Sequence, residues 1–148
     1  MIHIAAECGN IEMLKYLREK YVCRSQFKKG LGGVKESIVY LKKGYSIGLM
    51  IDQRVTEGEK IKFFNKISFT TTLPAQLALK YDLPIFPIFI ERKENDSFEM
   101  EIYKPILISD FKEKKTSKIA LSQRLNDILE TMIKKDPSQW ILTHNRWK

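Results

Sequence analysis

The stretch YSIGLMI at residues 45–51, which runs directly into Asp52, decides the fold class of this chain. It is an apolar run of strand length between Gly44 and Asp52, and such a run is typical of a buried β-strand. Residues 34–43 before it repeat apolar side chains at helical spacing, and Gly44 stands where a C-cap glycine is expected. A helix that leads into a buried strand indicates an α/β domain.

The remaining sequence alternates predicted helices and strands. Apolar spacing and capping residues predict helices at 2–21, 73–81 and 117–135, and a last short helix after Asp136-Pro137. Strands are predicted at 83–90 and 97–103, within a hairpin over 84–105, while 61–67 is predicted as a loop or short strand. The order of elements favours an α/β fold in which helices pack on a mixed sheet.

The composition points to an anionic partner. The formal net charge is +8 and the pI is about 9.4, which suits nucleic acid, an anionic bilayer surface or a phosphorylated substrate. The sequence holds no nucleic-acid motif with interleaved aromatic residues, so nucleic acid is not expected as a partner. Paired lysines such as Lys42-Lys43 and Lys134-Lys135 either face an anionic surface or are simply solvated.

The two cysteines, Cys8 and Cys23, have no metal-ligand spacing and form no disulfide framework. They are interpreted as reduced thiols, and no metal or cofactor is expected. Neither a signal peptide nor a run of about 20 apolar residues is present, so any membrane contact is expected to be peripheral, unless an anchor has been lost with a missing N-terminal part.

Three segments in this order carry a resemblance to a known family. They are the stretch 44–54 with Gly58 and Phe63-Phe64 after it, the stretch 69–89 (FTTTLPAQLA and LPIFPIF), and the ending 137–148, PSQWILTHNRWK. Each resembles the lipid A biosynthesis lauroyl/myristoyl acyltransferases, members of the lysophospholipid acyltransferase superfamily. The match covers roughly residue 17 onward.

This resemblance implies the C-terminal part of the glycerolipid/lysophospholipid acyltransferase fold. It also implies an enzyme that transfers a fatty acyl chain from acyl carrier protein to a hydroxyl of a lipid A precursor. Such an enzyme works at the cytoplasmic face of the inner membrane and uses no cofactor. In the family a His-x-x-x-x-Asp/Glu motif supplies the base that takes the hydroxyl proton.

The sequence contains no such motif, so we expect a truncated, incomplete form. His3 and Glu7 come closest, but their His-x-x-x-Glu spacing is one residue short, and an ordinary pair on a helix surface is the simpler interpretation.

Residues 3–17 look like part of one ankyrin repeat, which cannot fold alone. We therefore expect an N-terminal helical segment of uncertain origin at 1–20 and the acyltransferase-like domain at 21–148.

Six residues are candidates for substrate binding, each with a plainer alternative. Asp52, Gln53 and Arg54 follow a predicted strand end, where ligands commonly bind in α/β sheets, although a turn aspartate with solvated neighbours is the alternative. The family often has aspartate at the position of Arg54, which puts the role of Arg54 in doubt. The other three candidates, with N-capping or solvated charge as alternatives, are Thr71, Arg92 and Arg146.

Two further functions remain open beside the acyltransferase. One is a non-catalytic basic domain that binds anionic lipid, and the other is a degraded, non-functional remnant. His144 is interpreted as packed or facing a lipid headgroup. Trp140 and Trp147 are interpreted as headgroup-level residues, with core packing as the alternative for Trp140.

Overall fold

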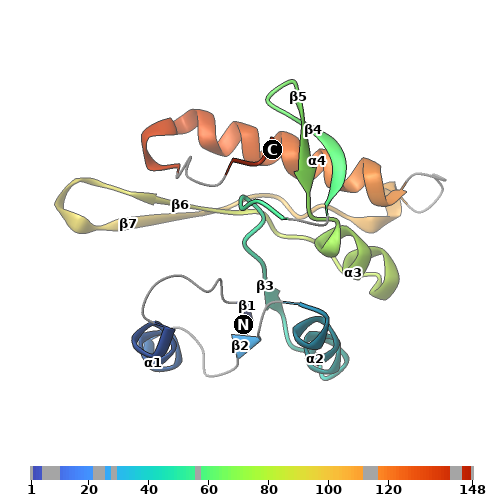
Figure 1. The fold of residues 1–148 in the computed structure, drawn as a ribbon, viewed down its shortest axis with the longest axis horizontal. Helices are drawn as coiled ribbons and strands as arrows, with labels where there is room; N and C mark the ends of the chain where they lie inside the picture. Colours follow the sequence, from blue (N-terminus) through green and yellow to red (C-terminus); the bar gives the residue numbers. More distant parts are fainter. Residues whose placement is uncertain are drawn as a thin grey trace. The chain divides into compact units, whose positions relative to one another are not determined.

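A computed structural model describes residues 2–4, 11–21, 26–27, 30–55, 58–111, 117–140 and 145–147 (Figure 1). The chain divides into two compact units, Met1–Met50 and Ile51–Lys148. Each unit combines helices with small sheets, so the predicted α/β class is confirmed.

The first unit is built on three short parallel strands. β1 (Ile2–Ile4) lies between β2 (Gln26–Phe27) and β3 (Ile47–Gly48). Parallel neighbours need a crossover connection, and α1 (Ile11–Tyr21) and α2 (Leu31–Lys42) lie in the two connections. The Phe27 ring is buried with its centroid 5.4 Å from that of Tyr40, which joins β2 to α2.

The predicted helix over 2–21 is wrong in its first part. Residues 2–4 are a strand because they pair with β2 and β3 on both sides, and the helix begins only at Ile11. The helical spacing in this region is carried by residues from Ile11 onward. The predicted strand over 45–51 is present only as Ile47–Gly48.

The predicted C-cap at Gly44 is confirmed. Gly44 has a φ of 82°, its amide donates to the Leu41 carbonyl at 2.9 Å, and the Tyr45 amide donates to the Tyr40 carbonyl at 3.1 Å. These two bonds form a Schellman motif, which satisfies carbonyls at the end of α2 and turns the chain towards β3.

The second unit contains two antiparallel hairpins and two helices. β4 (Glu59–Phe63) and β5 (Lys66–Thr70) form the first hairpin, with positive φ at both turn residues, Phe64 and Asn65. The stretch 61–67, predicted as a loop or short strand, therefore contains the hairpin turn. Helices α3 (Leu73–Tyr81) and α4 (Ser117–Lys135) have the same bounds as predicted.

The second hairpin, β6 (Ile88–Arg92) and β7 (Phe98–Ile102), confirms the hairpin predicted over 84–105. Its first strand begins later than the predicted residue 83, because prolines at 84 and 87 have no amide hydrogen for a ladder. Beyond the strands, Ile85 and Ile106 still form an isolated antiparallel bridge. Single turns of 3-10 helix, η1 (Glu94–Asp96), η2 (Ile108–Asp110) and η3 (Pro137–Gln139), complete the unit.

The core of this unit lies between α3 and α4. Its buried side chains come from both helices and from the segment around η2, and they are Ala75, Ala78, Ile106, Ile108, Leu121 and Leu125. Ile51 packs against this cluster, which anchors the segment that begins at Asp52.

Candidate functional site

A buried arginine near the C-terminal end is the centre of the candidate site. Arg146 is 0% exposed, so its interpretation as a solvated surface charge is wrong. Its Nη2 donates to Thr70 Oγ1 at 3.3 Å and to Asn126 Oδ1 at 3.2 Å. The guanidinium carbon lies 4.0 Å from the centre of the Phe63 ring, a cation–π contact.

A chain of hydrogen bonds fixes the acceptors of this arginine. Asn126 Nδ2 donates to the Lys62 carbonyl at 2.9 Å and to Thr70 Oγ1 at 3.0 Å. Thr70 Oγ1 thus accepts two bonds, and its own hydrogen is left for Ser68 Oγ, 3.2 Å away. Ser68 in turn donates to the Ile61 carbonyl at 3.3 Å. Every hydroxyl and amide in this chain has a partner, which holds the acceptors for Arg146 in place.

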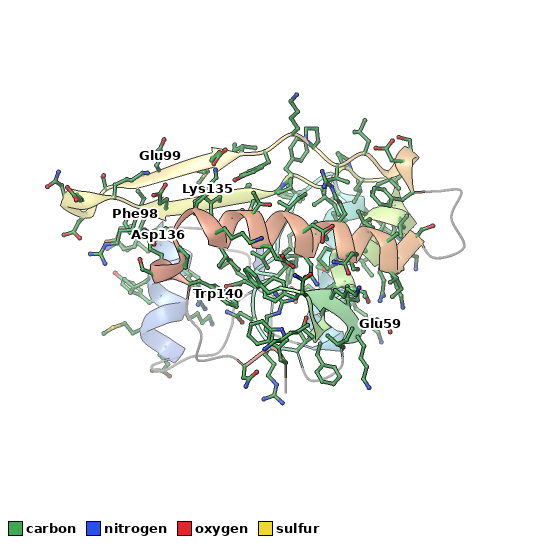
Figure 2. The ribbon with its side chains drawn as sticks, turned by 90° about the horizontal axis from the view of Figure 1, so that it is seen from above. Glu59, Phe98, Glu99, Lys135, Asp136 and Trp140 are labelled. Carbon is green, nitrogen blue, oxygen red and sulfur yellow. The ribbon has the colours of Figure 1, made fainter. Side chains whose placement is uncertain are left out.

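Two tryptophan rings pack on Phe63, the ring that the guanidinium contacts. Trp147 stacks on Phe63 with centroids 5.8 Å apart, and its indole Nε1 donates to the Phe63 carbonyl at 3.2 Å. Trp140 meets Phe63 edge-on at 5.7 Å (Figure 2). Both tryptophans are half-buried against these rings.

The guanidinium is only partly satisfied. Its Nε and Nη1 atoms are buried and have no hydrogen-bond partner among the described residues. Burial lowers the pKa of Arg146 to about 10, and the negative charge of Asp52 acts in the opposite direction. Arg146 is therefore a cation at neutral pH, and burying a cation in this way costs free energy that Asp52 partly offsets.

The segment after Ile51 lies against the same strand that holds the arginine. Asp52 and Gln53 are half-buried and Arg54 is exposed. Gly58 lies so close to β5 that a Cβ at this position would be 2.8 Å from the Thr70 amide nitrogen. Only glycine fits there without displacement, so the chain at Gly58 can approach β5 closely beside Thr70, a partner of Arg146.

The sequence-predicted residues thus fall into two groups. The structure places Asp52 near enough to Arg146 for its charge to act on the guanidinium, Gln53 follows it in the chain, and Thr71 lies next to the arginine's partner Thr70. Thr71 Oγ1 accepts from the amide of Leu73, the first residue of α3, at 3.3 Å, while the N-cap position itself is Thr72 and has no side-chain cap bond.

Arg92 is not part of this region. It lies at the distal end of β6, where its side chain is exposed and paired with Asp96. The Arg92 amide donates to Gln139 Oε1 at 2.8 Å, and Gln139 Nε2 donates to the Arg92 carbonyl at 2.9 Å. Glu7 and His144 lie outside the described residues, and so does the side chain of His3.

Sequence reasoning missed Asn126, Thr70 and Phe63 as partners of the arginine. One local signal existed: Ser122 and Asn126 are one helical turn apart and flank the apolar stripe of α4, where polar residues are exceptional. Both are fully buried.

The described ranges offer no metal site and one depression away from Arg146. No group of three or more His, Cys, Asp or Glu side chains could hold a metal ion there. A surface depression of about 260 Å³ is lined by Asp82, Pro84, Leu107, Ile108 and Ser109, and it shares no residue with the site around Arg146.

Comparison with known proteins adds one finding. The family model described as bacterial lipid A biosynthesis acyltransferase matches residues 16–148. No curated protein matches the chain. No described helix has the length and apolar character needed to cross a membrane.

Proposed function

The chain belongs to the bacterial lipid A biosynthesis acyltransferase family, and on that premise we propose that it transfers a fatty acyl chain from acyl carrier protein to a hydroxyl of a lipid A precursor. The acceptor oxygen attacks the thioester carbonyl carbon, an ester bond forms, and the carbon–sulfur bond breaks. The hydroxyl proton passes through a base to the departing thiol. Donors of hydrogen bonds stabilise the oxyanion that forms between these steps.

We assign acceptor binding to Asp52 and Gln53, with Arg54 beside them. The observation that supports this assignment is that Asp52 and Gln53 are half-buried and that the charge of Asp52 acts on the buried Arg146. A carboxylate and an amide held in this way can bond to sugar hydroxyls, while the exposed Arg54 is free to approach a phosphate. Because Arg146 is fully buried, its proposed role in substrate binding is to position this segment.

The base is not assigned to a described residue. The sequence has no His-x-x-x-x-Asp or His-x-x-x-x-Glu motif. The weak candidate pair is His3 and Glu7, and its test is direct. If turnover is lost in His3→Ala while the protein still melts cooperatively, His3 acts in catalysis.

We further propose that the chain acts peripherally at the cytoplasmic face of the inner membrane. Its net charge of +8 supports attraction to an anionic surface. Fractionation of cells that produce the tagged chain tests this location. Recovery of all the protein from the soluble fraction at low salt would contradict it.

The decisive experiment compares precursor binding by two variants, each of which lacks one carboxylate of the chain. Purified protein is mixed with acyl carrier protein thioester and lipid A precursor, and both product mass and precursor binding are measured. Asp52→Asn should weaken precursor binding about tenfold or more, because a hydrogen bond to a charged group contributes about 1.5–3 kcal/mol. The matched control is Asp127→Asn, since Asp127 is an exposed carboxylate on α4. Equal binding by the two variants would overturn the assignment of Asp52.

A further inference from the structure

The β4–β5 hairpin lies with one face on α4 (Figure 1). At its open end, Lys118 of α4 forms an ion pair with Glu59 at 2.7 Å. At its turn, the Phe64 amide donates to Glu130 Oε1 of α4 at 2.6 Å. Four side chains of the hairpin between these contacts are buried, namely Ile61, Phe63, Ser68 and Thr70. The helix therefore holds this face from end to end, and the other face of the hairpin is turned away from α4.

The face turned away from α4 combines lysines with apolar side chains. Alternation along the two strands puts four residues on it, which we call the outer hairpin face: Lys60, Lys62, Ile67 and Phe69. The strand register places Lys60 opposite Phe69 and Lys62 opposite Ile67, so each cation lies beside an apolar side chain. Both lysines are exposed, and Ile67 is 54% exposed. The outer hairpin face is thus accessible, cationic and partly apolar.

The positive charge of this hairpin is not compensated locally. Residues 59–70 contain three lysines and one acidic residue, Glu59, which is already paired with Lys118. Among the described residues, Lys60, Lys62 and Lys66 form no ion pair. The β6–β7 hairpin is the opposite case, because residues 88–102 contain five acidic and two basic side chains. The excess of positive charge is therefore a local property of the β4–β5 hairpin.

We propose that the outer hairpin face docks on an anionic bilayer, with Lys60 and Lys62 at the headgroup phosphates and Ile67 at the boundary with the acyl chains. This inference rests on the proposed function, since it names the part of the chain that meets the membrane in the proposed peripheral location. A lysine ammonium is a point charge on a flexible stem, which can reach a phosphate while its methylene groups lie along apolar surface. Each such lysine strengthens binding to an anionic surface.

The composition of the face favours lipid over an acidic protein as the partner. Protein interfaces are depleted in lysine and enriched in arginine, tyrosine and tryptophan. Both cations of the outer hairpin face are lysines, and the face contains none of the three enriched residue types. Its four side chains also offer no hydrogen-bond acceptor. The face can therefore donate to phosphate oxygens, but it cannot accept from the donors that a protein partner would present.

Two charge-matched double variants of the whole chain test the role of the lysines. Lys60→Gln/Lys62→Gln removes two cations from the outer hairpin face, and Lys80→Gln/Lys104→Gln removes two exposed lysines from other elements of the same unit. The vesicles contain phosphatidylcholine mixed with phosphatidylglycerol, flotation at low salt measures the bound fraction, and thermal melting confirms that both variants fold. We expect partitioning to fall about tenfold to thirtyfold in the first variant and less than about threefold in the second.

A second pair of variants tests the apolar part of the face. Ile67 on β5 and Ile90 on β6 are both isoleucines in hairpin strands, and each is 54% exposed. We expect Ile67→Ser to lower partitioning about fivefold and Ile90→Ser to leave it unchanged. The loss in Lys60→Gln/Lys62→Gln should shrink at high salt, because exposed charges are screened, whereas the loss in Ile67→Ser should persist.

Three results would overturn the inference. Equal partitioning of the two double variants would make net charge alone responsible for binding. Equal partitioning of Ile67→Ser and Ile90→Ser would show that the outer hairpin face does not enter the bilayer. If Lys60→Gln/Lys62→Gln lost binding to acyl carrier protein but kept its binding to vesicles, the occupant would be an acidic protein.

The vesicle measurements are independent of acyl transfer, because the vesicles contain neither lipid A precursor nor thioester. Loss of the difference between the variants, together with intact precursor binding, would refute docking and leave the proposed acceptor site standing. Docking through this face by a chain that does not bind the precursor would refute the acceptor site and leave the docking surface standing.

Discussion

Replacing Asn126 by leucine should destabilise the second unit strongly, although the two side chains are similar in size. Asn126 is 1% exposed and bridges the β4–β5 hairpin to the buried arginine. Its Oδ1 is one of two acceptors that Nη2 of Arg146 has, and the Nε and Nη1 atoms of that arginine already lack partners among the described residues. Leucine would therefore remove half of the hydrogen-bond acceptance of a buried cation.

The magnitude follows from the three bonds that are lost. The bond from Arg146 is charge-assisted and contributes about 1.5–3 kcal/mol, whereas the bond to Thr70 is neutral and contributes about 1 kcal/mol. The Lys62 carbonyl keeps a donor, since Gln123 Nε2 lies 3.1 Å from it, so the third bond adds little. We expect Asn126→Leu to lower the free energy of unfolding by about 3 kcal/mol, a large share of the 5–15 kcal/mol that holds typical domains folded.

Urea unfolding of the whole chain measures this loss, with Gln123→Ala as the control. Gln123 lies one turn from Asn126 and bonds the same carbonyl from the outside, so its removal should cost at most about 0.5 kcal/mol. A double-mutant cycle with Arg146→Met isolates the coupling, which should be about 1.5–3 kcal/mol. Equal losses in Asn126→Leu and Gln123→Ala, or a coupling near zero, would refute the role given to the arginine. Thr70→Val provides a milder second variant if Asn126→Leu fails to fold.

Three further predictions concern the surroundings of the site. Gly58→Ala should lower the free energy of unfolding by about 1–3 kcal/mol, because its methyl group would lie 2.8 Å from the Thr70 amide nitrogen; a melting curve that matches the wild type would contradict this. Trp147→Phe keeps a ring against Phe63 but removes the indole donor to its carbonyl, so a loss of about 1–2 kcal/mol in urea unfolding is expected, and no loss would show that this bond is unimportant. Hydrogen bonds from Ser138 and Gln139 lower the pKa of Asp136, so its stabilising effect is present near neutral pH and is lost as the pH falls through that lowered pKa. Asp136→Asn should therefore differ from the wild type in stability at pH 7 and converge with it in strong acid, and a constant difference across the pH range would argue against this cap.

The elements that sequence predicted well are those with local signals. The bounds of α4 follow from its apolar spacing and from Asp136-Pro137, which ends it, and α3 has Pro74 in its first turn, the only turn where proline is tolerated. Strand β1 could not be predicted in this way. Its three residues are extended because Gln26–Phe27 and Ile47–Gly48 pair with them. Partners so distant in the sequence cannot be predicted from a local pattern.

The alternation of β7 was recognised, but the sequence could not say which face would be covered. Phe98, Met100 and Ile102 would ordinarily face a core, yet they are more than half exposed. The opposite, charged face is the one that contacts α4 through Lys135. Orientation of a hairpin depends on which neighbour offers a matching surface, and that information lies in the helix rather than in the strand.

The same limitation applied to Arg146, which the sequence showed as one more basic residue near the end of the chain. Its backbone carbonyl accepts from the Phe69 amide at 3.1 Å, so the C-terminal segment is fastened to β5 next to Thr70. A shift of this segment by one residue would bring Asn145 or Trp147 to the position of the guanidinium, and neither side chain can donate to Thr70 and Asn126 from there while reaching the face of Phe63. A buried cation is a poor source of stability, but it can specify one register. In this chain that register also sets the distance between the cation and Asp52, so the arrangement of the C-terminal segment and the geometry of the proposed acceptor site are linked through a single side chain.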